Sequence, residues 1–504
     1  QAERSEMQPP AKAGRLTRSL VVNGGVFIFI AAIVAGAFVS AYWISASARG
    51  RAGLQRVATV LDTGRPMHQK FRNIEQHYHG CRQVCRVASI IPAGWGPLPP
   101  QQPPAPAPDA AEPATTACPA YFRWIHEDLR PWRATGITRE TLEGARRYGA
   151  KFRVTVLAGR LYVARYGRCF QTRDVFTQWG ILQLLRRYAG RLPDLDLMFN
   201  CQDLPVVNAG DHAPPPLFRY CGSEPTLDIA FPDWSFWGWP ELNIKPWEAL
   251  RREISEANAA LDWTRRTPYA YWKGNPTVGA ARRELLKCNV SRERDWNARI
   301  YAQDWRTEVR DGFRASDLAK QCTHRYKMYV EGRGWSVSEK YILACDSVAL
   351  VVRPRFHDFF SRGLVPLRHY WPVRGQCLSI KFAVDWGNSH PVQARVIGGN
   401  ASLFVQEELT MDNVYDYMFH LLSEYARLLR YKPTVPGGAV EVTVQSMARG
   451  RRGLEREFMA GTAVNVSGSA EPCELPSPFG SEELESLRRR KADAARQVET
   501  WEER

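Results

Sequence analysis

The length and composition of the chain exclude a small binding module and a disordered protein. It has 504 residues, of which 44% are hydrophobic and 11% aromatic, so we expect a sizeable core shared between two domains or two halves. Lys and Arg number 68 against 52 Asp and Glu, a net charge of +16. This excess favours an acidic partner: a nucleic acid, an anionic membrane or a phosphorylated small molecule.

The N-terminal region predicts where the protein resides. Residues 20–44 are mostly apolar and uncharged, and they are long enough to cross a bilayer core of about 30 Å. A cleaved signal peptide is the alternative, because Ala46-Ser47-Ala48 offers a cleavage site, but its apolar region is usually about 7–15 residues long. We therefore predict a transmembrane signal anchor at 20–44, preceded by a cytosolic tail at 1–19.

Two features after this segment favour a lumenal body. N-x-S sequons occur at Asn289, Asn400 and Asn465, and they accept glycans only in the secretory pathway. Nine prolines within 92–117 indicate an extended stem at the end of segment 45–117. The prediction is a single-pass type II membrane protein with no nucleic-acid partner.

The eleven cysteines do not form a zinc-binding pattern. The closest pair, Cys81 and Cys85, has no second pair that completes four ligands. In an oxidising lumen we expect disulfide bonds instead.

The folded body begins near residue 118 and is predicted to be α/β. Residues 152–166 indicate a hairpin around Ala158-Gly159, residues 176–190 a helix and residues 195–199 a half-buried strand. Strand, turn and helix alternate again after residue 266. The predicted parts are one α/β half at 118–265, a second α/β half at 266–400, a helix packing back on the body at 401–435 and an extension at 436–504.

Asp203 is the candidate catalytic residue of the first half. It follows the predicted strand 195–199, and reacting groups of α/β proteins usually lie at the carboxyl ends of strands. A carboxylate there is able to act as general base on an acceptor hydroxyl. Asp194 and Asp196 also form a D-x-D pattern, which either binds a divalent metal or faces solvent.

Tryptophans near residue 235 are candidates for contact with the acceptor. Trp237 and Trp239 lie in the segment AFPDWSFWGWP. Their rings suit stacking on a sugar or a peptide, and core packing under a loop is the alternative.

A second strand, turn and basic helix start follows Trp272. Gly274 and Asn275 lie in the turn, and Arg282 lies on the expected helix. This arrangement suits a contact to a nucleotide. The alternative is a tight connection followed by exposed arginines.

The stretch 326–347 is the strongest candidate for a phosphate site. A predicted strand leads to Gly332-Arg333-Gly334, and Ser336 with Glu339 fits a capping box that opens a helix. Free N–H groups and the helix dipole attract phosphate there. Lys340 adds a cation unless it points to solvent. An ordinary helix cap is the alternative.

Together with CPAYFRWIHEDLRPW at 118–132 and RFHDFFSRGLVPLRHYWPV at 355–373, these stretches resemble the Rumi-type protein O-glucosyltransferase family, glycosyltransferase family 90. This family also includes fungal capsule xylosyltransferases, and the chain is most similar to its plant branch. The resemblance covers roughly residues 118–431 and the segment FMAGTAVNVSGSAEPCELPSPF at 458–479, and its motif WSVSEKYILACDS is long enough to be specific.

The resemblance implies an inverting, metal-independent glycosyltransferase that uses UDP-glucose or UDP-xylose. It also implies a GT-B-like pair of Rossmann-type domains, an acceptor-side domain at 118–265 that carries the base and a nucleotide-sugar domain at 266–400. The family's catalytic aspartate corresponds to Asp203, within the segment 191–205. Because the family uses Asp or Glu at the position of Asp196, it implies no metal-binding D-x-D and no metal cofactor. Arg173 lies where the family contacts the acceptor.

The resemblance also implies a set of donor-binding residues. Animal members have an arginine for the diphosphate where this chain has Ser338, so Arg333, Lys340 and Arg353 are the candidate cations. The implied donor-binding residues are Gly274, Asn275, Arg282, Arg333, Ser336, Val337, Ser338, Glu339 and Lys340.

The predicted function is transfer of glucose or xylose to a hydroxyl of a cell-wall glycan or a secreted protein. One alternative is O-glucosylation of serine in EGF-like repeats, and another is a non-catalytic lectin or scaffold with the same fold. A membrane anchor without a C-terminal retention tetrapeptide favours the Golgi, with the endoplasmic reticulum as the alternative.

Overall fold

The computed structural model describes residues 117–467 and 469–504. These residues belong to one compact unit, Ile90–Arg504. The predicted tail, anchor and stem, together with Cys81 and Cys85, lie outside the described residues. Within the described part of the chain, no helix combines the length and the apolar character needed to span a bilayer.

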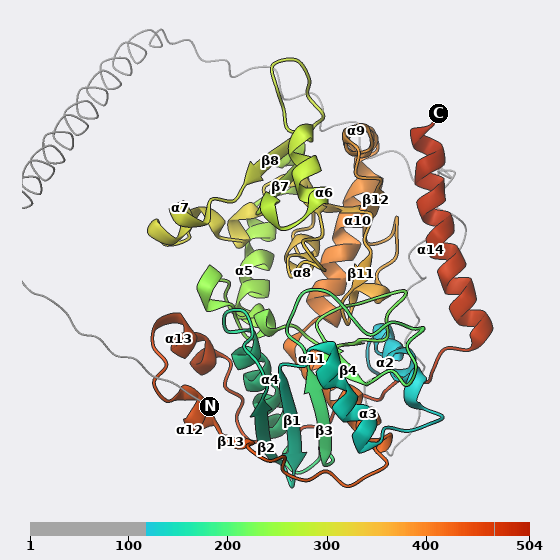
Figure 1. Cartoon of the computed structure of the whole chain (residues 1–504). Helices are drawn as coiled ribbons and strands as arrows, with labels where there is room; N and C mark the ends of the chain where they lie inside the picture. Colours follow the sequence, from blue (N-terminus) through green and yellow to red (C-terminus); the bar gives the residue numbers. More distant parts are fainter. Residues whose placement is uncertain (1–116, 468) are drawn as a thin grey trace, which may run out of the picture. The chain divides into compact units, whose positions relative to one another are not determined.

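The first sheet is mixed (Figure 1). Its order is β13-β2-β1-β3-β4-β6. Strand β1 is antiparallel to both β2 and β3, whereas β3, β4 and β6 are parallel to one another, and β13 adds to β2 antiparallel. The strands are β1 Phe152–Leu157, β2 Arg160–Arg165, β3 Leu195–Phe199, β4 Leu217–Arg219, β6 Ile229–Ala230 and β13 Val440–Val442.

The second sheet is parallel throughout, in the order β12-β10-β9-β7-β8. Numbered along the chain, this order is 2-1-3-4-5, and the direction of strand addition reverses between β7 and β9. Ligands of such sheets bind outside the carboxyl ends of the strands at this reversal. The strands are β7 Thr267–Gly274, β8 Ala298–Ala302, β9 His324–Tyr329, β10 Val348–Val352 and β12 Trp371–Val373.

The predicted GT-B-like pair of Rossmann-type domains is therefore wrong, although the α/β class is correct. The first sheet begins with a tight hairpin, in which Ala158 and Gly159 both have positive φ, and β3 pairs antiparallel with β1. A Rossmann sheet is built from parallel strands joined by crossover connections. The sequence pattern of alternating strands and helices is the same for both arrangements, so it does not reveal the direction of a strand.

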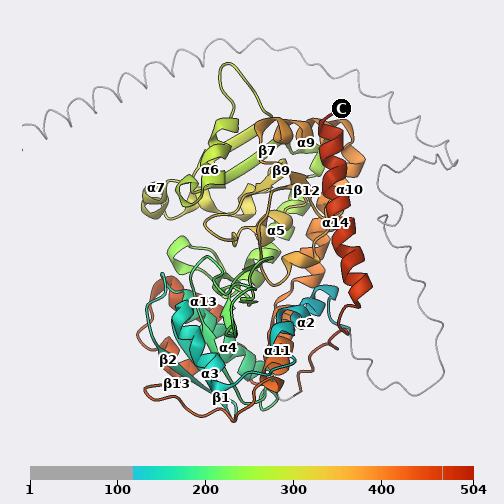
Figure 2. The same cartoon turned by 45° about the vertical axis from the view of Figure 1, so that its right-hand side comes forward.

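The helices cover the sheets and connect them (Figures 1 and 2). The helix predicted at 401–435 is interrupted, because a π-helix at Phe404–Glu408 precedes α11, and the Thr410 side chain caps α11. The α-helices are α2 Trp124–Asp128, α3 Arg139–Gly144, α4 Arg173–Arg187, α5 Trp247–Ala260, α6 Ala280–Leu285, α7 Trp305–Arg310, α8 Glu339–Leu343, α9 Cys377–Ser389, α10 Pro391–Leu403, α11 Met411–Arg427, α12 Val444–Ala448, α13 Gly453–Gly461 and α14 Ser481–Glu502.

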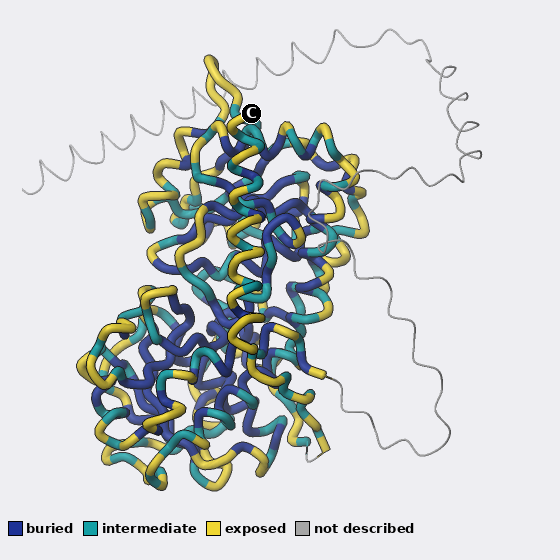
Figure 3. Tube along the Cα trace, turned by 90° about the vertical axis from the view of Figure 1, so that its right-hand side faces the viewer, coloured by how far each residue is buried: buried dark blue, intermediate teal, exposed yellow. Residues whose placement is uncertain are grey.

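Buried residues occur throughout both halves (Figure 3). They form two hydrophobic clusters: the larger surrounds the first sheet and extends to Tyr329, Ala349 and Val351 of the second, and the smaller lies around the rest of the second sheet. Helix α14 contacts both halves. Near its start Glu483 pairs with Arg123 at 2.5 Å, and near its end the Trp501 ring stacks on Trp386. The short strands β5 (Gly222–Ser223) and β11 (Phe356–His357) pair antiparallel and join the halves a second time.

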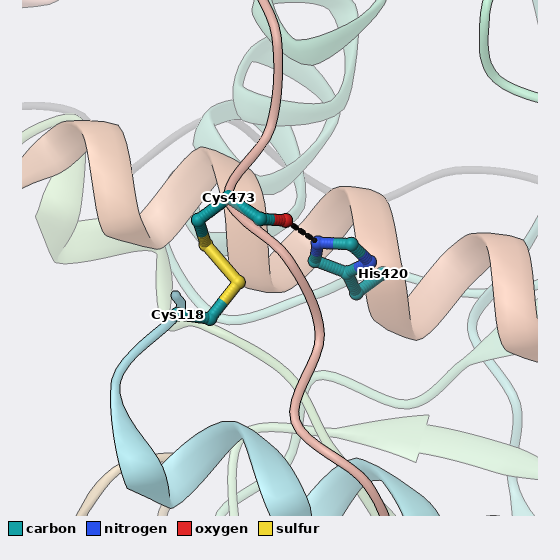
Figure 4. A group of neighbouring side chains, drawn as sticks. All are labelled: Cys118, His420 and Cys473. Carbon is teal, nitrogen blue, oxygen red and sulfur yellow. Dashed lines mark hydrogen bonds between the residues drawn. A yellow bond between two sulfur atoms is a disulfide. The ribbon is translucent and has the colours of Figure 1, made fainter. Parts of the chain in front are cut away.

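The predicted disulfides are present. Four bonds join Cys118 to Cys473, Cys169 to Cys201, Cys288 to Cys377, and Cys322 to Cys345. His420 lies beside the first of them and donates a hydrogen bond from Nε2 to the Cys473 carbonyl at 2.7 Å (Figure 4). Because both sulfur atoms are in the disulfide, these three residues do not form a metal site.

Candidate active site

Asp203 lies in the connection between β3 and β4, and its side chain is 35% exposed. Its Oδ1 accepts a hydrogen bond from Arg173 Nη1 at 2.7 Å. The disulfide Cys169–Cys201 ties the segment before α4 to the segment that carries Asp203. The candidate base therefore lies at a covalently restrained strand end and remains accessible to a substrate.

A buried ion pair, Arg219 with Asp228, is hydrogen-bonded to the backbone on both sides of Asp203. Arg219 Nη2 donates to the Gln202 carbonyl at 3.0 Å, and Asp228 Oδ2 accepts from the Val206 and Val207 N–H groups at 2.9 Å. Arg219 and Asp228 are 3.6 Å apart, and both side chains are fully buried. Burial raises the pKa of Asp228 to about 6.

Sequence reasoning missed Arg219 and Asp228. Neither residue belongs to a local motif, and they meet because β4 and β6 are neighbours in the sheet. The only signal in the sequence is a pair of charged residues within otherwise apolar segments, which is too common to be specific.

The donor-side candidates meet at the reversal between β7 and β9. Arg282 donates to the Asn275 carbonyl at 3.4 Å, to the Val330 carbonyl at 3.0 Å and to Ser336 Oγ at 3.0 Å. Gly274 ends β7, and Ser338 Oγ lies 2.9 Å from Ser336 Oγ. The structure therefore brings the segments 274–282 and 336–338 together. In the sequence, each of them was on its own a candidate for contact with a nucleotide or a phosphate.

The turn at Gly332-Arg333-Gly334 joins this donor side to Asp203. A Cβ atom at Gly334 would lie 2.2 Å from the Asp203 carbonyl oxygen, and one at Gly279 would lie 2.7 Å from the Gly332 carbonyl oxygen. Real Cβ atoms do not approach other heavy atoms so closely, so both contacts require glycine. The candidate donor loop and the candidate base are thus in backbone contact.

The predicted capping box is wrong. Helix α8 has only five residues, its N-cap is Ser338, and no side chain caps it. Glu339 is buried instead of reaching back to Ser336. The helix-dipole contribution expected for phosphate is correspondingly small, because a single turn sums few peptide dipoles.

Lys340 is buried, and its ammonium group is engaged by the chain. It is 2% exposed, and its Nζ donates to Ser235 Oγ at 2.8 Å and to the Val337 carbonyl at 3.2 Å, with Asp233 Oδ2 at 3.3 Å. Arg333 and Arg353 are exposed, and no ion-pair partner for either is found in the described part of the chain. They are the candidate cations that remain.

The two predicted tryptophans lie in different environments. Trp237 is fully buried, donates from Nε1 to the Tyr415 hydroxyl at 2.9 Å and packs against Gly180, so it belongs to the core. Trp239 is half-buried and donates to Gln171 Oε1 at 2.9 Å, close to Arg173 in the chain. The neighbouring Phe170, 63% exposed, is a further aromatic side chain near the base that sequence reasoning did not select.

Asp194 and Asp196 are both engaged by the protein. Asp194 Oδ1 accepts from the Ala158 N–H at 2.7 Å. Asp196 is fully buried and accepts from Arg153 Nε at 2.6 Å. This D-x-D therefore stabilises the first sheet.

The three sequons differ in accessibility. Asn465 is exposed, and Asn400 is half-buried on α10. The Asn289 amide bonds to both backbone groups of Ile300 at 3.0 Å.

A surface depression of about 630 Å³ lies elsewhere, between the end of α5 and α10. Its lining includes Arg266, which precedes β7, and Asp346, which precedes β10. It therefore lies at the amino edge of the parallel sheet, opposite the candidate site.

Four buried carboxyl groups lie near Lys340 or near its neighbour Glu339. Glu331 follows β9, Glu339 opens α8, Asp358 follows β11 and Asp233 pairs with Lys340. Burial, followed by the charges of Asp358 and Glu331, holds the pKa of Glu339 well above its usual range. Burial also raises the pKa of Asp358 to about 6. Acidification therefore reduces the repulsion inside this cluster.

When the pH falls from about 7.5 to about 5, the free energy of unfolding of the parent chain should rise. We expect this rise to be about 1 kcal/mol larger in the parent than in the variant Asp358→Asn, which lacks the titrating carboxyl group. The pKa of Asp358 is about 6 in the folded chain and ordinarily 3.8. The stabilisation that comes from protonating Asp358 in the folded chain is therefore fully present below the unfolded pKa, and it is lost as the pH rises through about 6. Urea unfolding at both pH values measures it. The exposed control Asp412→Asn should follow the parent, and identical pH dependence in Asp358→Asn would contradict the prediction.

Comparison with known proteins identifies the family. The family model described as Glycosyl transferase family 90 matches residues 113–502. The chain is 26% identical over 347 residues to O-glucosyltransferase rumi of Drosophila melanogaster, covering 64% of this chain and 81% of that protein. It is 26% identical over 336 residues to Protein O-glucosyltransferase 1 of Homo sapiens, covering 63% and 82%. The match includes both sheets and the Asp203 connection. The chain therefore belongs to glycosyl transferase family 90 and is a glycosyltransferase, as the resemblance predicted.

Proposed function

We propose that the chain transfers glucose or xylose from a UDP-sugar to a hydroxyl of a cell-wall glycan or a secreted protein, with inversion at the anomeric carbon. The contact of Gly334 with Asp203 carries this proposal, because it joins the candidate donor loop to the candidate base. Relatives named O-glucosyltransferase favour glucose as the transferred sugar.

The proposed step is a direct displacement. Asp203 Oδ2 takes the proton of the acceptor hydroxyl while the hydroxyl oxygen bonds to the anomeric carbon. The bond from that carbon to the diphosphate oxygen breaks, and UDP leaves with the electron pair. Arg333 and Arg353 supply positive charge at the carboxyl edge of the second sheet for the leaving diphosphate.

We propose that this reaction is metal-independent. In nucleotide-sugar enzymes that use a D-x-D, its carboxylates hold a divalent cation, whereas here Asp196 is buried against Arg153 and Asp194 is bonded to the chain. The positive charge at the diphosphate then comes from arginine side chains.

The proposed location is the lumen of the Golgi, with the endoplasmic reticulum as the alternative. Four disulfides support an oxidising compartment, because such bonds are rare in the cytosol. The anchor at 20–44 stays a prediction about residues that the structure does not describe.

UDP release by the full chain from UDP-glucose and from UDP-xylose tests the proposal. The assay is run with and without EDTA, and with either an EGF-like repeat or cell-wall oligosaccharides as acceptor. We expect EDTA-resistant release from one donor, stimulated by one acceptor class. Release that requires a divalent cation would contradict metal independence, and UDP binding without release from either donor would favour a non-catalytic role.

A further inference from the structure

The Arg173 side chain is held rigidly next to Asp203. It is the first residue of α4, and its side chain is only 10% exposed. Its guanidinium lies 4.3 Å from the centroid of the Trp234 ring, and Nη1 donates to the Cys201 carbonyl at 3.1 Å. Cys201 is itself fixed by its disulfide to Cys169. Aromatic stacking and the carbonyl contact therefore fix the guanidinium independently of a substrate.

This arrangement distinguishes the two oxygens of the candidate base. The same Nη1 donates to Asp203 Oδ1 at 2.7 Å, whereas no partner for Oδ2 is found among the residues that the structure describes. A fixed donor on one oxygen sets the plane of the carboxylate and leaves the other oxygen available. The guanidinium also places a positive charge beside the carboxylate, and a carboxylate is the form of Asp203 that is able to take a proton.

We propose that Arg173 is a positioning residue that holds Asp203 through Oδ1 and presents Oδ2 to the acceptor hydroxyl. This inference rests on the proposed function of Asp203 as base. It differs from the acceptor contact that the family resemblance implied, because the guanidinium is nearly buried and already engaged by the chain.

Arg173→Met tests the proposal, because methionine keeps much of the apolar contact with Trp234 and removes the charge and the donor. The assay measures UDP release with water as the acceptor. We expect the rate to fall about 10²-fold, as for a displaced reacting group. The acidic limb of the pH–rate profile should move to higher pH, while calorimetric UDP affinity stays unchanged. Arg173→Lys should restore the position of the acidic limb in part, because it keeps the charge.

Arg165→Met is the matched control. Arg165 ends β2, is 52% exposed and pairs with Asp174 on α4, the helix that Arg173 begins. Its replacement therefore removes a nearby cation without changing a contact of Asp203. This variant should keep the parent rate and the parent pH profile.

Three outcomes are distinguishable. An unchanged rate and pH profile with water, combined with weaker acceptor binding, would make Arg173 an acceptor contact and overturn the proposal. Arg173→Met could instead unfold at a lower urea concentration than the parent and bind UDP more weakly, with the acidic limb of its pH–rate profile unshifted. That result would show a structural role for Arg173 and would also overturn the proposal. Retained transfer in Asp203→Asn would instead overturn the proposed base, whatever the Arg173 variants do.

Discussion

Asp203→Asn should lower UDP-sugar turnover by about 10²–10⁴-fold while UDP still binds with the parent affinity. Asparagine has the shape of aspartate, and its side-chain oxygen still accepts the hydrogen bond from Arg173. The buried pair of Arg219 and Asp228 holds the connection at Gln202 and Val206, so the backbone should not move. The amide is not basic enough to take the acceptor proton, and only the chemical step should fail.

Initial rates of UDP release and calorimetric titration with UDP together check this prediction. Asp211→Asn is the matched control, because Asp211 lies in the same connection and its carboxylate is bonded away from Arg173, to the Asn208 N–H at 2.9 Å and to the Tyr148 hydroxyl. The control should turn over at the parent rate. Turnover in Asp203→Asn within a few-fold of the parent would exclude Asp203 as the base.

Asp196→Asn should lower the free energy of unfolding by about 3–5 kcal/mol. Asp196 is fully buried, and its carboxylate accepts from Arg153, from Thr155 Oγ1 at 3.1 Å and from the Tyr431 hydroxyl at 2.9 Å. The neutral amide leaves the buried Arg153 guanidinium without its full countercharge. The other partner of Arg153, Glu143, is half exposed and compensates only in part.

Urea unfolding measured by intrinsic tryptophan fluorescence gives this difference. Glu441→Gln, which breaks the exposed pair with Arg160, is the control and should change stability little. The folded fraction of Asp196→Asn should keep its turnover without added metal. Parent-like stability, with activity lost and then restored by a divalent cation, would instead show that Asp196 is a metal ligand.

The elements that the sequence predicted well are those determined by residues close together in the chain. The hairpin follows from β-branched and aromatic residues on both sides of Ala158-Gly159. The strand β3 is where its apolar residues predicted it, but it is buried on both faces and not half-buried, because Asp196 and Met198 are covered as well. The prediction of a capping box was wrong, although Ser336 and Glu339 have the required spacing. Glu339 is buried near the carboxyl groups of Glu331 and Asp358, and both of these residues lie outside the local S-x-x-E pattern.

By itself, the sequence determined the family, the position of Asp203 at a strand end and the two glycine-containing donor motifs, because each is a short-range pattern. Only the tertiary structure decided the antiparallel start of the first sheet, the burial of Lys340 against Asp233, and the bond from Arg173 to Asp203. Alternation along a strand indicates which side chains share a face, but it does not indicate the neighbouring strand or its direction. Likewise, whether a charged side chain meets a substrate or a buried partner depends on segments that meet only after folding.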